Sequence, residues 1–116
     1  MTVKGIGVDI ADIRRFRKPT MRRDDRFIRT TFSTSECKYC FSYRDPAPHL
    51  AGAFAAKEAV RKVYGDKKIG LSDIEVRHCA SGKPEIWING ELSKTFLVSI
   101  SHDATIAIAV AFNQTP

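Results

Sequence analysis

The chain has 116 residues with a formal net charge of +6, and 43% of them are hydrophobic and 28% charged. This length suits one domain with a modest core, and this composition is typical of a soluble globular protein rather than a disordered or fibrous one. No apolar run approaches the roughly 18 residues of a membrane span, and the first residues do not resemble a signal peptide, so we expect a single cytoplasmic domain, residues 1–116, without a membrane partner.

Residues 3–10, VKGIGVDI, alternate between two kinds of side chain. The branched apolar residues fall on one face and the small or acidic residues on the other: Ile6, Val8 and Ile10 against Gly5, Gly7 and Asp9. This alternation predicts a strand whose apolar face is buried. Residues 12–18 can begin a helix that Pro19 would end or kink. A further helical stretch is expected around 22–29.

The clearest helix signals lie in the middle of the chain. Ser33 and Glu36 have the spacing of a capping box, which predicts a helix from there to about Tyr43. The stretch 50–64 predicts a longer helix, and Gly65 is placed to end it. Residues 45–48 are expected to form a loop or the start of that helix.

The second half of the chain predicts strands at 74–79, 85–88, 96–101 and 105–112, with a turn at 80–83 and a hairpin turn at 102–104. In the last strand, alanines at 107, 109 and 111 alternate with large apolar residues. An all-alanine face allows very close packing, and the alanine-rich face of helix 50–64 is the expected partner. The fold class is therefore predicted as α+β, an antiparallel sheet with helices packed on it in a single small domain.

Nearly all of the excess positive charge lies in residues 12–29, which contain eight Arg or Lys residues and three Asp residues. A concentrated basic surface attracts an acidic macromolecule through its long-range field, and that partner could be a nucleic acid or an acidic protein. The alternative is a surface that is merely solvated.

The three cysteines of the chain cannot pair completely, which favours a reducing compartment. Cys37 and Cys40, with Cys79 after His78, supply ligand types that zinc accepts. A second Cys-x-x-Cys is missing, so we expect these cysteines to pack as small hydrophobic side chains.

The helix at 50–64 brings charged residues next to a run of small apolar ones. Phe54, Glu58 and Lys62 are four residues apart and therefore share one face. An exposed Glu58–Lys62 pair is worth only about 0.3–0.5 kcal/mol and by itself implies no function.

Asp9 changes this interpretation because it lies on the glycine-lined face of its strand, where a ligand or an ion can approach the backbone. Asp9 and Glu58 would then supply hard oxygen ligands from two elements, which suits Mg²⁺ completed by water and phosphate. Lys57, Lys62 and His102 can neutralise phosphate charge. The expected chemistry is transfer or hydrolysis at a phosphate ester or pyrophosphate.

Five segments, in this order and at these separations, resemble the holo-acyl-carrier-protein synthase family, the small class of 4′-phosphopantetheinyl transferases. They are GIGVDIADIRRF (5–16), FSTSE (32–36), LAGAFAAKEAVRKVYG (50–65), SGKPEIW (81–87) and VSISHD (98–103). The resemblance spans nearly the whole chain and implies that family's fold. It implies an enzyme that transfers 4′-phosphopantetheine from coenzyme A to a serine of apo acyl carrier protein and releases 3′,5′-ADP, in fatty acid or polyketide biosynthesis.

The resemblance also implies a role for individual residues. Asp9 and Glu58 would bind Mg²⁺ together with the coenzyme A pyrophosphate, and Lys62 would complete the catalytic set by contacting phosphate. The residues implied in coenzyme A binding are Phe54, Lys57, Lys62, Gly82, Lys83, Pro84, Ser101 and His102. Glu36 matches a third acidic position and could accept the proton of the carrier serine, as could a metal-bound water. A capping-box role explains Glu36 equally well.

For the basic segment, the resemblance implies docking of acyl carrier protein, an acidic helical protein, on Arg14, Arg22, Arg23 and Arg26. It also implies a homotrimer whose active sites are shared between neighbouring subunits. Many relatives carry a basic residue where this chain has Ala53. A contact to the 3′-phosphate of coenzyme A is therefore missing or comes from elsewhere, with Lys83 or Arg44 as candidates.

Two other functions use parts of the same evidence. A nucleic-acid-binding module would account for the basic segment, but that segment contains only two aromatic residues, and Asp9, Glu58 and His102 would be left without a role. A Mg²⁺-dependent phosphohydrolase would use the two acids but has no use for the arginine surface. We therefore expect no nucleic-acid partner.

Overall fold

The computed structural model describes residues 2–65 and 69–115. Its elements are β1 (Val3–Asp12), the 3-10 helix η1 (Ile13–Arg17), α1 (Arg26–Thr31), α2 (Thr34–Cys40), α3 (Ala47–Tyr64), the 3-10 helix η2 (Leu71–Asp73), β2 (Ile74–His78), β3 (Pro84–Ile88), β4 (Glu91–Leu92), β5 (Phe96–His102) and β6 (Ile106–Gln114). Within this part of the chain, no helix has the length and apolar character needed to cross a membrane.

Most predicted elements are present, with shifted ends. The helix expected at 12–18 is the short 3-10 helix η1, and the stretch around 22–29 becomes helical only from Arg26. The capping box of Ser33 and Glu36 is confirmed, although α2 ends at Cys40. Helix α3 begins at Ala47 and ends at Gly65, whose φ of 62° is a backbone conformation that glycine adopts without steric cost.

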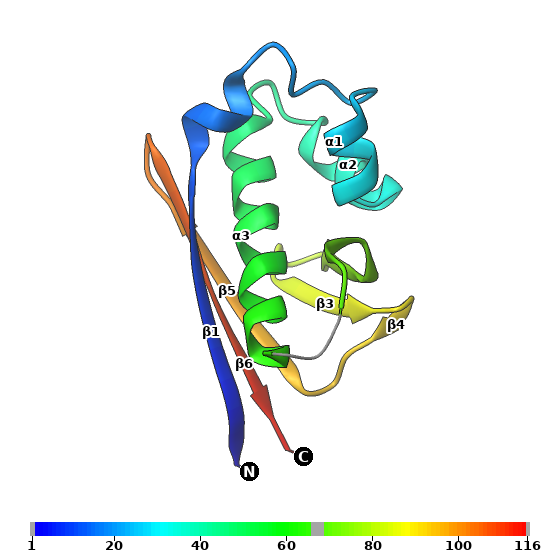
Figure 1. The fold of residues 1–116 in the computed structure, drawn as a ribbon, viewed down its shortest axis with the longest axis vertical. Coiled ribbons are helices and arrows are strands. Elements are labelled where there is room, and N and C mark those ends of the chain that lie inside the picture. The colour runs from blue at the N-terminus through cyan, green and yellow to red at the C-terminus, as the bar shows by residue number, and fades with distance from the viewer. Residues whose placement is uncertain (1, 66–68, 116) are drawn as a thin grey trace.

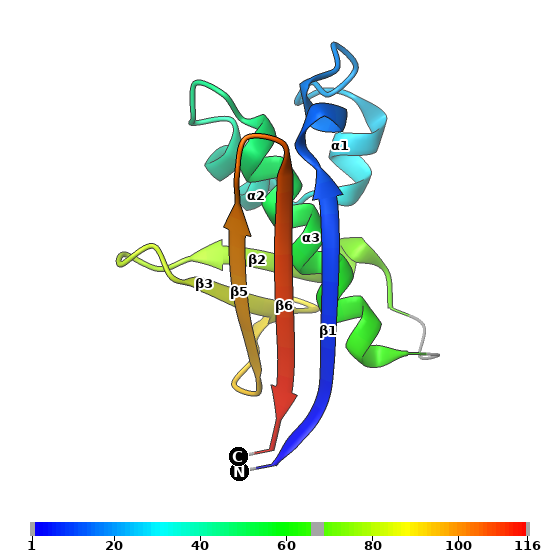
Figure 2. The same cartoon turned by 90° about the vertical axis from the view of Figure 1, so that its left-hand side faces the viewer.

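The strands form two antiparallel sheets rather than the single sheet that the sequence predicts. One sheet has the order β1-β6-β5, and the smaller one has the order β2-β3-β4. Helix α3 lies along the larger sheet (Figure 1) and also contacts β2. Figure 2 shows β2 and β3 running across the direction of β1, β5 and β6. The core therefore forms around α3, which contacts both sheets.

Where α3 packs on β1 and β6, the face of the larger sheet carries small residues. Ala107, Ala109 and Ala111 of β6 are buried, as are Ala55 and Ala59 of α3. Helix α3 packs closely on both β1 and β6, so the predicted pairing of the two alanine-rich faces is confirmed.

The predicted burial of the apolar face of the first strand is wrong for the single chain. Ile6, Val8 and Ile10 are 61%, 51% and 62% exposed. The reason is steric. The opposite face of β1 carries Gly7, where a Cβ atom would clash with the backbone oxygen of Ala59. Only the residues with little or no side chain fit between the strand and the helix, so the larger ones point outward.

Candidate active site

The close approach of β1 to α3 brings Asp9 to the helix. Lys62 Nζ lies 3.1 Å from Asp9 Oδ1 and also donates to the backbone oxygen of Val8 at 2.9 Å. The Lys62 side chain is 55% exposed and that of Asp9 only 16%. The carboxylate is therefore shielded from solvent on one side while the ammonium group remains accessible to a substrate.

Glu58 lies one helical turn before Lys62 and so shares its face of α3. Its side chain is 24% exposed, and its nearest cation is Arg61, with 3.7 Å between Arg61 Nη1 and Glu58 Oε1. Asp9 bonds to Lys62, and Glu58 precedes Lys62 by one turn on the same face of α3. The predicted contact of Asp9 with Lys62 is thus present, and the joining of Glu58 to them in one metal site stays a prediction.

This donor set fits a hard divalent cation. Asp9 and Glu58 offer carboxylate oxygens. Their negative charges are paired with the exposed cations of Lys62 and Arg61 respectively, and not with buried ones. Among the described residues, no group of three or more His, Cys, Asp or Glu side chains gathers into a metal site. Mg²⁺ held here would keep its remaining positions for water and phosphate oxygens, as that ion usually does.

Lys57 does not lie in this site. It is fully buried, and its Nζ lies 2.6 Å from Glu36 Oε1. The second oxygen of Glu36 accepts the backbone N–H of Val76 at 2.7 Å. The predicted contact of Lys57 with coenzyme A is contradicted, because this pair joins α2, α3 and β2 inside the core. Breaking such a pair by removing one partner costs about 3–5 kcal/mol.

Glu36 is equally enclosed, so it cannot accept a proton from an incoming serine in this structure. It is 1% exposed and receives hydrogen bonds from the Ser33 and Val76 backbones as well as from Lys57. Burial raises the pKa of its carboxyl group, against the opposing effects of Lys57 and these hydrogen bonds. Its role is the structural one, the capping box with an added internal ion pair.

A cavity of about 430 Å³ opens at the β5 edge of the larger sheet, opposite the β1 edge that carries Asp9. We call it the histidine cavity, because all three histidines of the chain line it: His49 from α3, His78 from β2 and His102 from β5. The predicted turn residues Gly82, Lys83 and Pro84 line it as well.

Sequence reasoning found His102 and the turn but missed His49 and His78. No local motif surrounds either residue, and only the packing of α3 against β2 brings them together. Ala53, with its short side chain, also lines the cavity.

Two other predicted ligand contacts lie elsewhere. Ser101 is paired with Ile108 on β6 and lines a small hollow with Ile106 and Ile108 on the outer face of the sheet. Phe54 packs with Phe16, the ring centroids being 5.6 Å apart, and belongs to an aromatic cluster next to η1 and α1. Within one chain, neither residue lines the histidine cavity.

The predicted docking arginines all lie on the surface, in η1, in α1 and in the segment between them. Arg14 pairs with Asp12 and Arg22 with Asp24, each at 2.9 Å. Both ion pairs are exposed and therefore contribute little to stability. Arg23 and Arg26 are exposed as well. The arginines thus remain accessible, although two of the acids in the segment partly neutralise them.

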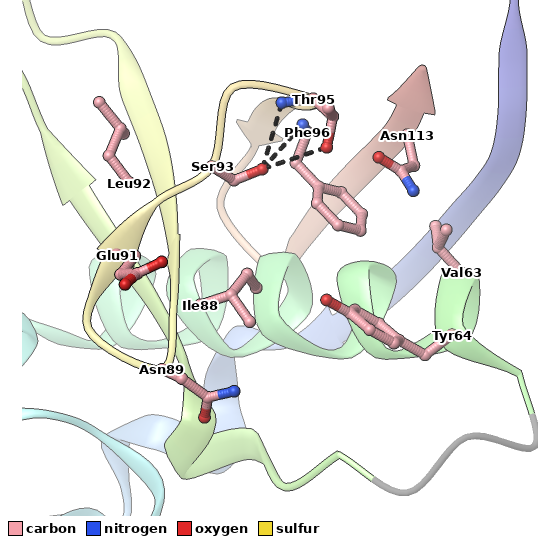
Figure 3. A pocket seen from close by; sticks show the side chains of 10 residues that line it. All are labelled: Val63, Tyr64, Ile88, Asn89, Glu91, Leu92, Ser93, Thr95, Phe96 and Asn113. Carbon is pink, nitrogen blue, oxygen red and sulfur yellow. Dashed lines mark hydrogen bonds between the residues drawn. The ribbon is translucent and has the colours of Figure 1, made fainter. Parts of the chain in front are cut away.

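A further cavity, of about 510 Å³, lies at the C-terminal end of α3 (Figure 3). Tyr64 and Phe96 stack there with ring centroids 5.8 Å apart, and Ser93 Oγ accepts the backbone N–H groups of Thr95 and Phe96. None of the predicted site residues lines this cavity. Neither Asp9 nor Glu58 lines this cavity, so we do not assign it to the candidate active site.

Comparison with known proteins identifies the family of the chain. Residues 5–111 match the model of a family described as the 4′-phosphopantetheinyl transferase superfamily. A holo-[acyl-carrier-protein] synthase of Thermodesulfovibrio yellowstonii is 40% identical over 108 residues, covering 92% of this chain and 95% of that protein. One of Chlorobaculum parvum is 41% identical over 113 residues, covering 94% and 97%. The chain belongs to the holo-acyl-carrier-protein synthase family.

Solved structures of this family have the same fold. The Bacillus anthracis holo-(acyl-carrier-protein) synthase in complex with CoA (3′,5′-ADP) matches with a TM-score of 0.82 and 29% identity over 100% of both chains. The Helicobacter pylori enzyme in complex with coenzyme A matches with a TM-score of 0.77 and 32% identity, covering 94% of this chain and 99% of that one. The family and the fold predicted from the sequence are confirmed, and so is the prediction that the chain is an enzyme.

Proposed function

We propose that this chain transfers 4′-phosphopantetheine from coenzyme A to a serine of apo acyl carrier protein, depends on Mg²⁺, and releases 3′,5′-ADP. The observation that carries the proposal is the contact of Asp9 on β1 with Lys62 on α3, one helical turn after Glu58 on the same face of that helix. Membership of the holo-acyl-carrier-protein synthase family supports the reaction type. A cytoplasmic location, in the service of fatty acid or polyketide synthesis, belongs to the same proposal.

In this reaction the carrier serine oxygen forms a bond to the β-phosphorus of coenzyme A. The bond from that phosphorus to the bridging oxygen breaks, the hydroxyl proton is released, and 3′,5′-ADP leaves with the negative charge. Bound Mg²⁺ would withdraw electron density from the pyrophosphate and stabilise the charge that develops there. Asp9 and Glu58 would hold that ion. Lys62, accessible at the edge of the site, would donate to a phosphate oxygen.

The nucleotide end of coenzyme A would occupy the histidine cavity. Lys83 and His102 line the cavity and would face its phosphate charge, while Gly82 and Pro84 shape the turn. Gly82 has a φ of 89°, a conformation that glycine adopts readily and that permits the tight turn before β3.

The positions of these parts within one chain support a shared active site. Asp9 and Lys62 are at the β1 edge of the larger sheet, and the histidine cavity is at its β5 edge, with β6 and α3 between them. A substrate that contacts both parts fits most directly where the β1 edge of one subunit meets the β5 edge of the next. The exposed apolar face carrying Ile10 and Ile108 supports the homotrimer that this arrangement needs.

The basic surface would receive the carrier protein. Arg14 of η1, Arg26 of α1, and Arg22 and Arg23 in the segment between them are exposed, and an acidic helical protein complements them in charge. Docking there would bring the carrier serine toward the neighbouring Asp9 end of β1, because η1 follows β1 directly.

The proposal is tested by incubating the chain with Mg²⁺, coenzyme A and apo acyl carrier protein and weighing the carrier by mass spectrometry. The expected result is a carrier heavier by one phosphopantetheine arm. Glu58→Gln should lower the transfer rate by at least about 100-fold, since a metal ligand is lost, with an unchanged circular dichroism spectrum. Glu91→Gln, the same exchange at an exposed position on β4, is the matched control and should keep full activity.

Other outcomes separate the alternatives. A fully active Glu58→Gln enzyme would contradict the metal site. Hydrolysis of coenzyme A without carrier modification would favour a phosphohydrolase, and salt-sensitive DNA or RNA binding alone would favour a nucleic-acid module.

The combined change Arg14→Glu and Arg22→Glu should raise the KM for the carrier far more than that for coenzyme A, whereas Lys94→Glu, outside the basic segment, should change neither. Equal losses for both substrates would contradict the docking surface.

A further inference from the structure

The histidine cavity contains an unusual set of stacked rings. His78 stacks on Tyr39 with ring centroids 3.9 Å apart and planes 6° apart. His49 stacks on Tyr43 with centroids 3.5 Å apart and planes 13° apart. The rings of His49 and His102 have their centroids 6.2 Å apart. Three titratable rings from three elements are thus held in fixed positions around one cavity.

The charge of this cavity depends on the histidines. Among the described residues that line it, Lys83 is the one lysine or arginine, and none is an aspartate or glutamate. The Tyr39 phenol does not add charge, because burial raises its pKa to about 12. The charge that the cavity carries beyond Lys83 therefore depends on whether the imidazoles are protonated.

His49 and His78 both resist protonation while the cavity contains no anion. Burial, followed by repulsion from His102 and His78, lowers the pKa of His49. Asp45 opposes this effect but is itself paired with Arg17 at 2.7 Å. Burial also lowers the pKa of His78, whose Nδ1 is buried without a hydrogen-bond partner among the described residues. An anion in the cavity would relieve both the repulsion and the unsatisfied nitrogen.

We propose that His49 and His78, together with His102, bind the 3′-phosphate of coenzyme A and make the preference for coenzyme A over dephospho-coenzyme A depend on pH. This inference rests on the proposed function, which brings the nucleotide to this cavity. Coenzyme A has one phosphate outside its pyrophosphate, a monoester that gains its second charge near pH 6. Imidazoles gain their charge in the same range, so this phosphate and these side chains are matched.

The sign of the effect follows from proton linkage. A bound phosphate dianion favours the imidazolium form and raises the pKa values of His49 and His78, which burial lowers in the free protein. Binding of coenzyme A should therefore take up protons, and the preference should weaken as pH rises through the raised values. If binding raises one histidine pKa by one unit, the preference changes by about tenfold. We expect the ratio of the two dissociation constants to be about tenfold larger at pH 6.5 than at pH 8.5.

The experiment is isothermal titration calorimetry of the Mg²⁺-supplied chain with coenzyme A and with dephospho-coenzyme A at pH 6.5, 7.5 and 8.5. His49→Gln and His78→Gln should each flatten the pH dependence of the ratio. Lys83→Gln is the matched control at the same cavity, because it removes a permanent charge and should lower the ratio equally at every pH. Proton uptake, measured in buffers of different ionisation enthalpy, tests the unmodified chain and does not depend on the folding of any variant.

The outcomes separate this inference from the function on which it rests. Coenzyme A that binds and is transferred, with a ratio that does not change with pH and no proton uptake, would overturn the role of the histidines alone. A pH-dependent ratio that survives both histidine substitutions would also overturn it. Failure to bind coenzyme A at every pH would overturn both the inference and the proposed function.

Discussion

In β1 and β6 of the larger sheet, the two faces differ chiefly in residue size, and the face with the smaller residues is the one that packs on α3. On the inner face, Gly7 and Ala109 lie against α3, and on the outer face Ile10 and Ile108 are paired across the strands and exposed. Burial of apolar surface would favour the larger side chains inside. Close contact with a helix requires the smaller ones. The larger side chains are left on a surface that other copies of the chain can cover.

The largest expected effect comes from adding one methyl group to the inner face at Gly7. Gly7→Ala places a Cβ against the backbone oxygen of Ala59, which cannot move aside without displacing α3. We expect a loss of about 4 kcal/mol or more in the free energy of unfolding, measured by urea denaturation at a fixed protein concentration.

Gly5→Ala is the matched control on the same face of the same strand. Its Cβ would meet only the Cγ1 atom of Val63 at 2.7 Å, the end of a side chain that can shift. The cost should be about 1 kcal/mol. If the two variants lose equal amounts of the free energy of unfolding, the contact of Gly7 with the Ala59 backbone costs no more than a contact with a side chain, and our explanation is wrong.

A smaller effect is expected from Ala109→Leu, in the middle of the alanine face. Ala109 is 1% exposed and is paired with Asp9 in the strand register. Overpacking should cost about 1–3 kcal/mol, and the displaced Asp9 should also lower the rate of phosphopantetheine transfer. The exchange Ile108→Leu, one residue away on the outer face, should stay within about 0.5 kcal/mol in the same assay. If both variants unfold alike, the two faces do not differ as we describe.

The smallest effect on the fold is expected from charges on the outer face. Ile10→Lys and Ile108→Glu face each other across β1 and β6, so the new charges can pair. The single chain should lose less than about 1 kcal/mol. Sedimentation should nevertheless change from three chains to one, and transfer should fall with it if active sites are shared.

Two results would contradict this account of the outer face. If the natural chain already sediments as one subunit, the homotrimer is wrong. If the charged variant unfolds, the outer face is required within the chain rather than between copies.

The sequence predicted the elements that local signals define. The capping box of α2 and the glycine that ends α3 were found because both are local signals, and the alanine face was found because its period is two. The predicted catalytic residues of α3, Glu58 and Lys62, rest on spacing along one helix and on resemblance, and their role stays a prediction.

What the sequence could not provide depends on contacts between distant elements. Lys57 is one residue from Glu58, and its assignment to the core comes from Glu36 on another helix. His49 and His78 are 29 positions apart in the numbering and meet only because α3 contacts β2. The exposure of Ile10 was mispredicted because an alternating strand shows that its two faces differ, but not which of them the helix covers.

The first and last described residues of the chain lie side by side. The backbone N–H of Thr115 donates to the Thr2 oxygen at 2.9 Å, and the N–H of Thr2 donates to Thr115 Oγ1 at 3.1 Å. Figure 2 shows both ends together at the end of the sheet away from the β5–β6 turn. A short peptide could therefore join β6 to β1, and new ends could be opened at the Asn89–Gly90 turn. Such a permuted chain would keep every element where it is, so the chemistry would depend on the spatial layout and not on the order of synthesis.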